Sequence, residues 1–245
     1  NPTGSYKDRG SAVLVSQLLG RGAKRAVEDS SGNAGASFAA YAARGGLRAR
    51  VFVPESASGP KRVQIEAAGA ELVSVPGPRS EAAKAVLDEV KRGVPYASHA
   101  YLPFGLMGIA TIAYEIWEEL GRAPGTIISP VGHGGLLLGI VRGFTALKNA
   151  NLIDKHPYYV AVQAENCAPM VALDRGGAEA MQSMLEGPTQ AEGVRVRWPV
   201  RVNAILNEID PSMRKIIGVN EDELLRAFHY LPRRGIHVEP TSALA

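Results

Sequence analysis

The chain has 245 residues, of which 46% are hydrophobic and 21% charged, with one cysteine and a net charge of +3. This composition is typical of a soluble globular protein and excludes a disordered chain, a collagen-like repeat and a disulfide scaffold. No apolar stretch reaches the ~20 residues of a membrane helix, and the basic residues are too scattered to indicate nucleic-acid binding. The lone Cys167 fits a reducing cytoplasm. We therefore expect a cytoplasmic protein that acts on a small molecule, without membrane or nucleic-acid partners.

From residue 8 to residue 200, stretches with a helical apolar period alternate with short runs of β-branched residues. Such alternation predicts an α/β fold with open, twisted, mostly parallel sheets and helices on both faces. Four helices end in RGA, RGG, AGA or RGV, whose glycine suits the left-handed conformation just past a helix end. The predicted helices are 8–19, 34–43, 60–68, 79–91, 107–120 and 136–149, and the predicted strands are 24–29, 48–54, 71–75, 94–98, 125–131 and 158–165.

The periodic pattern weakens toward the end of the chain. We predict a surface loop over 175–196, a helix over 221–230, a short strand over 235–239 and the start of another helix over 240–245. Pro and Gly at 98–107 predict a crossover between two lobes.

Both ends of the chain have the character of interior segments. The chain begins with Asn1 instead of Met and ends inside the segment TSALA. We therefore expect a fragment that is truncated at both ends.

The glycine-rich turn GHGG at 132–135 lies between a predicted strand and a predicted helix. A helix N-terminus presents free N–H groups and the positive end of the helix dipole, and glycine permits close backbone approach. The turn is therefore a candidate phosphate site, with a tight turn that binds nothing as the alternative. A dinucleotide site is a second alternative because Glu165 ends the next strand, although the G-x-G-x-x-G fingerprint would require glycine at Leu137.

The segment DSSGNAGAS at 29–37 also joins a predicted strand to a predicted helix. Ser30, Ser31 and Asn33 place two hydroxyls and an amide beside free helix N–H groups, which suits a carboxylate ligand. The alternative is that Ser31 or Asn33 only caps the helix.

The opening segment NPTGSYKDRG places Lys7 at the start of a helix. A lysine held as the neutral amine can form a Schiff base with an aldehyde cofactor. The alternative is a solvated surface lysine.

Taken in this order, NPTGSYKDRG, SSGNAG and a glycine-rich strand-to-helix turn resemble the motifs of the fold type II pyridoxal-phosphate enzymes, the tryptophan synthase β-subunit fold. Threonine synthase, serine/threonine dehydratase and cysteine synthase belong to this group. The resemblance covers essentially the whole chain and implies pyridoxal 5′-phosphate as cofactor, an amino-acid substrate and a homodimer. It also implies that residues 1–22 and 106–245 belong to a large, incomplete cofactor-binding lobe, and that residues 23–105 form a smaller lobe on the substrate side.

The resemblance also implies roles for individual residues. Lys7 would be the catalytic lysine that carries the cofactor as an internal aldimine and removes the α-proton of the substrate. The other implied cofactor ligands are Asn33 at the 3′-oxygen, Glu239 of EPTSA beside the ring and, at the 5′-phosphate through backbone N–H groups, Gly132, His133, Gly134, Gly135 and Leu136. The implied ligands of the substrate carboxylate are Ser30, Ser31, Gly32 and Ala34. The residue that contacts the pyridine nitrogen is expected beyond the end of the chain.

The turn HGGLLLG and the segment GIATIAYEI are similar to those of the dehydratases. This similarity favours a lyase that performs β-elimination or β-replacement on a hydroxy or activated amino acid. Threonine synthase is the second possibility because it resembles NPTGSYKDRG and the PVG before the turn most closely, but it uses an arginine for substrate phosphate where this chain has Gly105. A catalytically silent cofactor-binding homologue and a nicotinamide-binding Rossmann protein are the remaining alternatives.

We predict no metal site, because the histidines lack the spacing of metal ligands. They are expected to be surface or capping residues and are His99, His156, His229 and His237.

Overall fold

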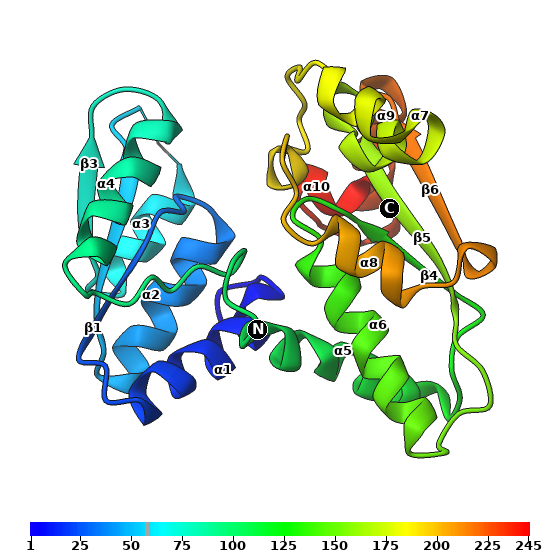
Figure 1. The fold of residues 1–245 in the computed structure, drawn as a ribbon, viewed down its shortest axis with the longest axis horizontal. Helices are drawn as coiled ribbons and strands as arrows, with labels where there is room; N and C mark the ends of the chain where they lie inside the picture. The colour runs from blue at the N-terminus through cyan, green and yellow to red at the C-terminus, as the bar shows by residue number, and fades with distance from the viewer. Residues whose placement is uncertain (57–58) are drawn as a thin grey trace. The chain divides into compact units, whose positions relative to one another are not determined.

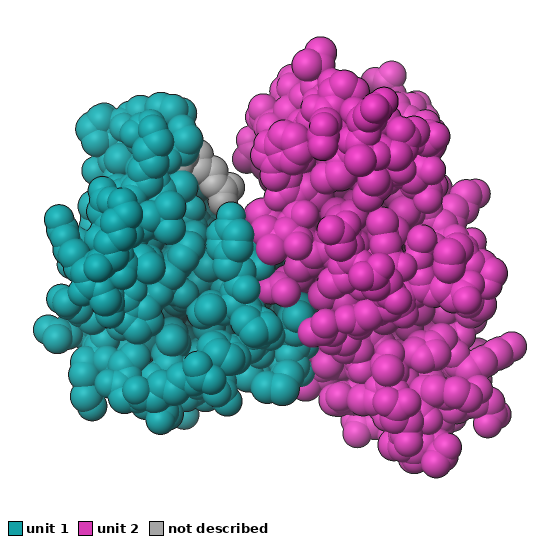
Figure 2. Space-filling model, viewed as in Figure 1, with its two compact units in different colours: residues 1–109 teal, residues 110–245 magenta. Residues whose placement is uncertain are grey.

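The structure is a computed structural model that describes residues 1–56 and 59–245. It divides into two compact units, Asn1–Ile109 and Ala110–Ala245, which Figure 2 colours separately. Within the described residues, each unit contains one three-stranded parallel sheet with helices packed on it (Figure 1). The predicted α/β class is therefore confirmed. The assignment of residues 1–22 to a larger lobe stays a prediction.

The first unit contains a parallel sheet of order β1-β2-β3. Its elements are α1 (Lys7–Gly20), β1 (Arg25–Glu28), α2 (Asn33–Gly45), β2 (Arg48–Pro54), α3 (Pro60–Ala67), β3 (Glu71–Val75), α4 (Arg79–Lys91) and the beginning of α5 (Gly105–Leu120). Successive strand side chains point to opposite faces of the sheet. Ala26 and Val51 accordingly pack in one core with α1, α2 and α3, whereas Val27 and Phe52 pack in a second core with α4. Helices therefore cover both faces, as predicted.

The second unit contains a parallel sheet of order β4-β5-β6. After the end of α5, its elements are β4 (Thr126–Pro130), α6 (Gly135–Asn149), β5 (Tyr158–Ala164), η1 (Glu165–Cys167), α7 (Pro169–Ser183), η2 (Glu192–Val194), α8 (Val202–Glu208), η3 (Pro211–Met213), β6 (Arg214–Val219), α9 (Glu221–Tyr230), η4 (Leu231–Arg234) and α10 (Pro240–Ala243). Val162 and Ala164 of the central strand pack with Leu224 of α9 and Ala243 of α10 in one buried core.

The local signals for helix ends are confirmed. The glycines of RGA, RGG, AGA and RGV adopt left-handed φ values of +81°, +69°, +76° and +83°, at Gly22, Gly46, Gly69 and Gly93 respectively. Helix α9 begins with a capping box, in which the Asn220 side chain accepts from the backbone N–H of Glu223 and the Glu223 carboxylate accepts from that of Asn220. These caps satisfy N–H groups that a helix end otherwise leaves unpaired.

Three predictions about strands are wrong. Residues 94–98, all within the described chain, form no strand, because Pro95 lacks an N–H and the segment keeps only an isolated bridge between Val27 and Tyr96. Residues 235–239, also described, form no strand, because Gly235 turns the chain at φ +77°. The pattern also does not predict β6, an edge strand that pairs only with β5 among the described strands; its sequence begins with two charged residues.

The loop predicted over 175–196 is wrong in its first half. Helix α7 extends through it to Ser183, and the pair Gly176–Gly177 interrupts the helix only locally, with Gly177 at φ +72°. The following residues AEAMQS contain good helix formers, which restart the helix after the kink. Glycine thus produces a bend here instead of the predicted end of structure.

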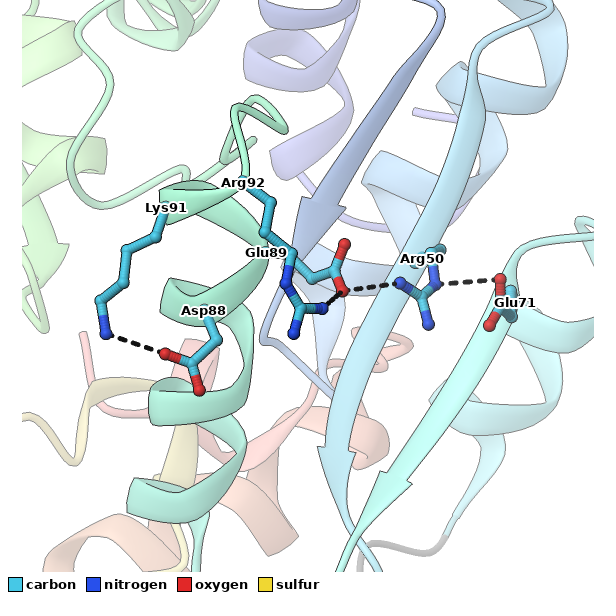
Figure 3. Close-up of polar contacts among 6 residues, drawn as sticks. All are labelled: Arg50, Glu71, Asp88, Glu89, Lys91 and Arg92. Carbon is cyan, nitrogen blue, oxygen red and sulfur yellow. Dashed lines mark hydrogen bonds and ion pairs between the residues drawn. The ribbon is translucent and has the colours of Figure 1, made fainter.

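An ion-pair cluster holds the first sheet to its covering helix. Figure 3 shows Arg50 of β2 between Glu71 of β3 and Glu89 of α4, with nitrogen to oxygen distances of 3.0 and 3.2 Å. Arg92 also contacts Glu89, at 3.0 Å. The cluster joins three elements but lies at the surface, where water and salt weaken such pairs.

Within residues 1–56 and 59–245, the helices are too short or too polar to cross a membrane.

Candidate cofactor site

The segment before Lys7 is fixed by a buried carboxylate. Asp8 is 1% exposed and accepts hydrogen bonds from the backbone N–H of Thr3 at 2.8 Å and from its hydroxyl at 2.7 Å. Ser5 Oγ accepts from the backbone N–H of Lys7 at 3.3 Å. Gly4, at φ +79°, makes the turn between them. Because an anion at the first turn of a helix is also favoured by the helix dipole, this loop has a defined conformation where α1 begins.

Lys7 is the first residue of α1 and is partly buried. Its Nζ lies 4.9 Å from the centre of the Tyr6 ring, within the range of a cation–π contact. Lys61 of α3 also reaches this loop, through a 3.3 Å hydrogen bond from its Nζ to the carbonyl of Thr3. Lys7 is therefore held on an ordered helix start, with its amine near an aromatic face.

The segment after β1 turns sharply into α2. A Cβ placed on Gly35 would lie 1.8 Å from the carbonyl oxygen of Ser30, so only glycine fits at this position. Gly32 is the N-cap residue, and within the described residues no side chain forms a capping bond to this helix. The capping alternative for Ser31 and Asn33 is therefore wrong. Ser30 Oγ instead accepts from the backbone N–H of Gly32, at 3.3 Å.

Two carboxylates at the end of β1 pair with the segment that runs beside it. Tyr96 Oη donates to Asp29 Oδ1 at 2.6 Å, and His99 Nδ1 lies 3.2 Å from Oε1 of Glu28, which is 1% exposed. Burial, then the charges of Asp29 and Glu28, raise the pKa of the Tyr96 phenol far above its usual value. The expectation that His99 is a surface or capping residue is wrong, because it pairs with a buried carboxylate.

The glycine-rich turn after β4 leads directly into α6. Gly134 is the N-cap residue at φ +90°, and a Cβ on it would lie 2.6 Å from Ile205 Cδ1. A Cβ on Gly132 would lie 3.1 Å from the carbonyl oxygen of Gly193. The first N–H groups of a helix lack intrahelical partners and carry partial positive charge. The turn thus has the close packing and the helix N-terminus that a backbone phosphate site requires.

The segment EPTSA packs beside this turn within the second unit. Glu239 is exposed and is the N-cap residue of α10, and Thr241 Oγ1 accepts from the backbone N–H of Gly193 at 3.1 Å. Gly193 is also the residue whose carbonyl approaches Gly132. EPTSA is therefore linked to the turn through η2.

Sequence reasoning missed Arg201, which adjoins the same turn. Its backbone N–H donates to the carbonyl of His133 at 3.2 Å, and the residue is 9% exposed. The contact joins residues 68 positions apart (201 − 133), so no local motif reveals it, and the sequence carries no other signal of it.

The chain belongs to the family described as "Pyridoxal-phosphate dependent enzyme", whose profile matches residues 1–245. The resemblance on which the cofactor prediction rests is thereby confirmed, and pyridoxal phosphate is the cofactor that this family uses. The family match favours this interpretation over the nicotinamide-binding alternative.

Curated relatives carry the name threonine synthase. The protein of Methanocaldococcus jannaschii is 35% identical over 99% of this chain and 61% of its own length, and that of Mycobacterium bovis is 31% identical over 99% and 66%. The chain therefore spans about three fifths to two thirds of these relatives.

Solved structures share the fold. A threonine deaminase, whose source is given as T.th., aligns with a TM-score of 0.79 and 28% identity over 99% of this chain and 76% of that one. Maize serine racemase aligns with the same TM-score at 20% identity, over 99% and 71%, which shows the fold alone. The fold type II architecture is thus confirmed.

Proposed function

We propose that the protein to which this chain belongs is a pyridoxal-phosphate-dependent lyase. Its reaction would be β-elimination or β-replacement on a hydroxy or activated amino acid. The observation that carries the proposal is the ordered start of α1, where buried Asp8 fixes the loop from which Lys7 extends. Such a fixed amine suits a family whose cofactor is an aldehyde.

The proposed cofactor ligands are those that the family resemblance implies. Lys7 would bind the aldehyde carbon through Nζ, and Asn33 the 3′-oxygen. The backbone N–H groups of the turn would bind the 5′-phosphate, with Glu239 beside the ring; the residues of the turn are Gly132, His133, Gly134, Gly135 and Leu136. The fit is supported by the close packing around Gly132 and Gly134, which keeps the backbone of the turn in place.

The bound cofactor supplies an electron sink for the carbanion formed at the substrate α-carbon. Lys7 Nζ would take the α-proton, because it is the amine released when substrate binds. The carboxylate would be held by the hydroxyls of Ser30 and Ser31 and by the backbone N–H groups around Gly32 and Ala34, at the N-terminus of α2. Two hydroxyls beside a helix N-terminus suit a carboxylate.

A threonine synthase is the second candidate. It is favoured by the curated relatives, which carry that name at 31% to 35% identity. Gly105 favours elimination instead, because a Cβ on it would lie 3.4 Å from both the carbonyl oxygen and the Cα of Gly10 in α1, which leaves a larger side chain little room near its base. A catalytically silent homologue is the third candidate, and we propose a cytoplasmic homodimer in each case.

The first experiment adds pyridoxal 5′-phosphate to the purified protein, reduces it with borohydride and maps the labelled peptide. We expect the label on Lys7 and none in a Lys7→Ala variant. Lys24→Ala is the matched control, because Lys24 is exposed just before β1 and should not change the labelling. A label distributed over surface lysines would contradict the proposal.

The reaction is then assigned by product. L-serine and L-threonine are tested for release of a 2-oxo acid, and O-phosphohomoserine for release of phosphate. A 2-oxo acid supports the lyase, phosphate supports threonine synthase, and neither product from a protein labelled at Lys7 supports the silent homologue.

A further inference from the structure

Arg201 lies against the glycine-rich turn of the second unit. It immediately precedes α8, and its backbone N–H donates to the carbonyl of His133 at 3.2 Å. Its Cβ lies 3.3 Å from the position that a Cβ would take on Gly134, and its Nε lies 4.0 Å from the corresponding position on Gly135. The guanidinium stem therefore runs past the first residue of α6, where the helix N–H groups begin.

The surroundings of this cation carry further positive charge. Arg201 is 9% exposed, and the pKa of its guanidinium is lowered, first by burial and then by the charge of Arg142. Arg142 is paired with the carboxylate of Glu208, at 2.6 Å. The N-terminus of α6 adds a positive potential at the same place. An anion bound here would offset the cost of burying a cation beside other positive charge.

We propose that Arg201 is a further ligand of the cofactor phosphate, supplying a full positive charge to a site otherwise built from neutral backbone N–H groups. This inference rests on the proposed function, because it requires the phosphate to bind at the turn. A guanidinium offers several N–H donors in a fixed plane, which suits phosphate oxygens. A dianionic phosphate would balance both the buried cation and the helix N-terminus.

The test compares pyridoxal 5′-phosphate with pyridoxal, which has the same ring and aldehyde but no phosphate. Dissociation constants are measured by absorbance titration for the wild type and for Arg201→Met and Arg201→Lys. We expect Arg201→Met to weaken binding of pyridoxal 5′-phosphate at least tenfold and to change binding of pyridoxal by less than twofold. Arg201→Lys keeps the charge and should lose less affinity than Arg201→Met.

Arg214→Met is the matched control for a purely structural arginine. Arg214 Nη1 donates to the carbonyls of Leu206 and Ile209 at the other end of α8. Its replacement should lower the unfolding temperature without changing the ratio of the two dissociation constants. If Arg201→Met does not fold, inorganic phosphate is titrated as a competitor against the wild type and Arg201→Lys, and the lysine variant should need more phosphate for the same displacement.

Other results would overturn the inference. Equal weakening of both ligands in Arg201→Met would mean that Arg201 only supports the turn, and unchanged affinity for pyridoxal 5′-phosphate would mean that it has no role in binding. For the competition experiment, equal displacement by phosphate in both proteins has the same meaning. A wild type that binds no pyridoxal 5′-phosphate and is not labelled at Lys7 would instead refute the proposed function, and this inference with it.

Discussion

Replacing Gly35 with alanine should damage the turn between β1 and α2 far more than an ordinary glycine substitution. The added Cβ would lie 1.8 Å from the carbonyl oxygen of Ser30 and 3.2 Å from Ile65 Cδ1. To reach even 3.0 Å from that oxygen, the turn and the helix must separate by more than an ångström. Alanine gains about 1 kcal/mol over glycine inside a helix, but overpacking costs about 1 to 3 kcal/mol or more. We therefore expect a net loss of about 2 kcal/mol in unfolding free energy.

The matched control is Gly32→Ala in the same turn. There the nearest side-chain atom to the new Cβ is Ser30 Oγ at 3.9 Å, and φ is −102°, which alanine adopts readily. This variant should lose less than about 1 kcal/mol, the usual scale for an altered N-cap. Urea denaturation of both variants, followed by circular dichroism, measures the difference without requiring any cofactor or substrate.

The same pair of variants tests the role of the turn in substrate binding. A displacement of about an ångström can lower the rate of catalysis about 100-fold, so kcat/KM should fall by that order in Gly35→Ala and by only a few-fold in Gly32→Ala. Two variants with equal stability would refute the reasoning about the close approach. A destabilised Gly35→Ala with unchanged kcat/KM would refute the assignment of the turn to the substrate.

Three further predictions concern the first unit. Asp8→Ala removes a buried acceptor of two hydrogen bonds and should cost about 3 kcal/mol in urea denaturation, whereas Asp8→Asn, which can still accept one of them, should cost less. Arg50→Met should cost about 1 kcal/mol at low salt and less in 1 M NaCl, and a salt-independent loss would mean that the ion pairs of Figure 3 contribute nothing. The raised pKa of Tyr96 stabilises the fold fully below its unfolded pKa of about 10 and progressively less as the pH rises above it, so unfolding free energy should fall above pH 10. Tyr96→Phe should flatten that part of the pH profile, and an unchanged slope in this variant would show that other groups, such as Tyr159, dominate it.

Features encoded by neighbouring residues were predictable from the sequence. The left-handed glycines after four helices and the start of α9 at Asn220 each depend on a few adjacent residues. The two strand-to-helix turns were also recognisable, because glycine and small polar residues interrupt the apolar period there.

Features that join distant residues were not predictable. Glu28 and His99 are 71 residues apart, and Asp29 and Tyr96 are 67 apart, so nothing in their spacing shows that they pair. Arg201 belongs to the same class, because its contact with the turn arises from the packing of α8 on α6. In each case the tertiary structure, and not a local propensity, gives a charged side chain its partner.

The two candidate anion sites use the same local construction, one in each unit. In parallel sheets, ligands are bound beyond the carboxyl ends of strands, where a turn meets a helix N-terminus. After β1, Gly35 allows the carbonyl of Ser30 to approach α2, and the turn carries hydroxyls. After β4, Gly134 allows α8 to approach α6, and the approaching segment carries Arg201. Hydroxyls beside backbone N–H groups match a carboxylate with one charge, whereas a guanidinium matches a phosphate with nearly two. The difference between the two turns is therefore the difference expected between a site for the amino-acid carboxylate and a site for the cofactor phosphate.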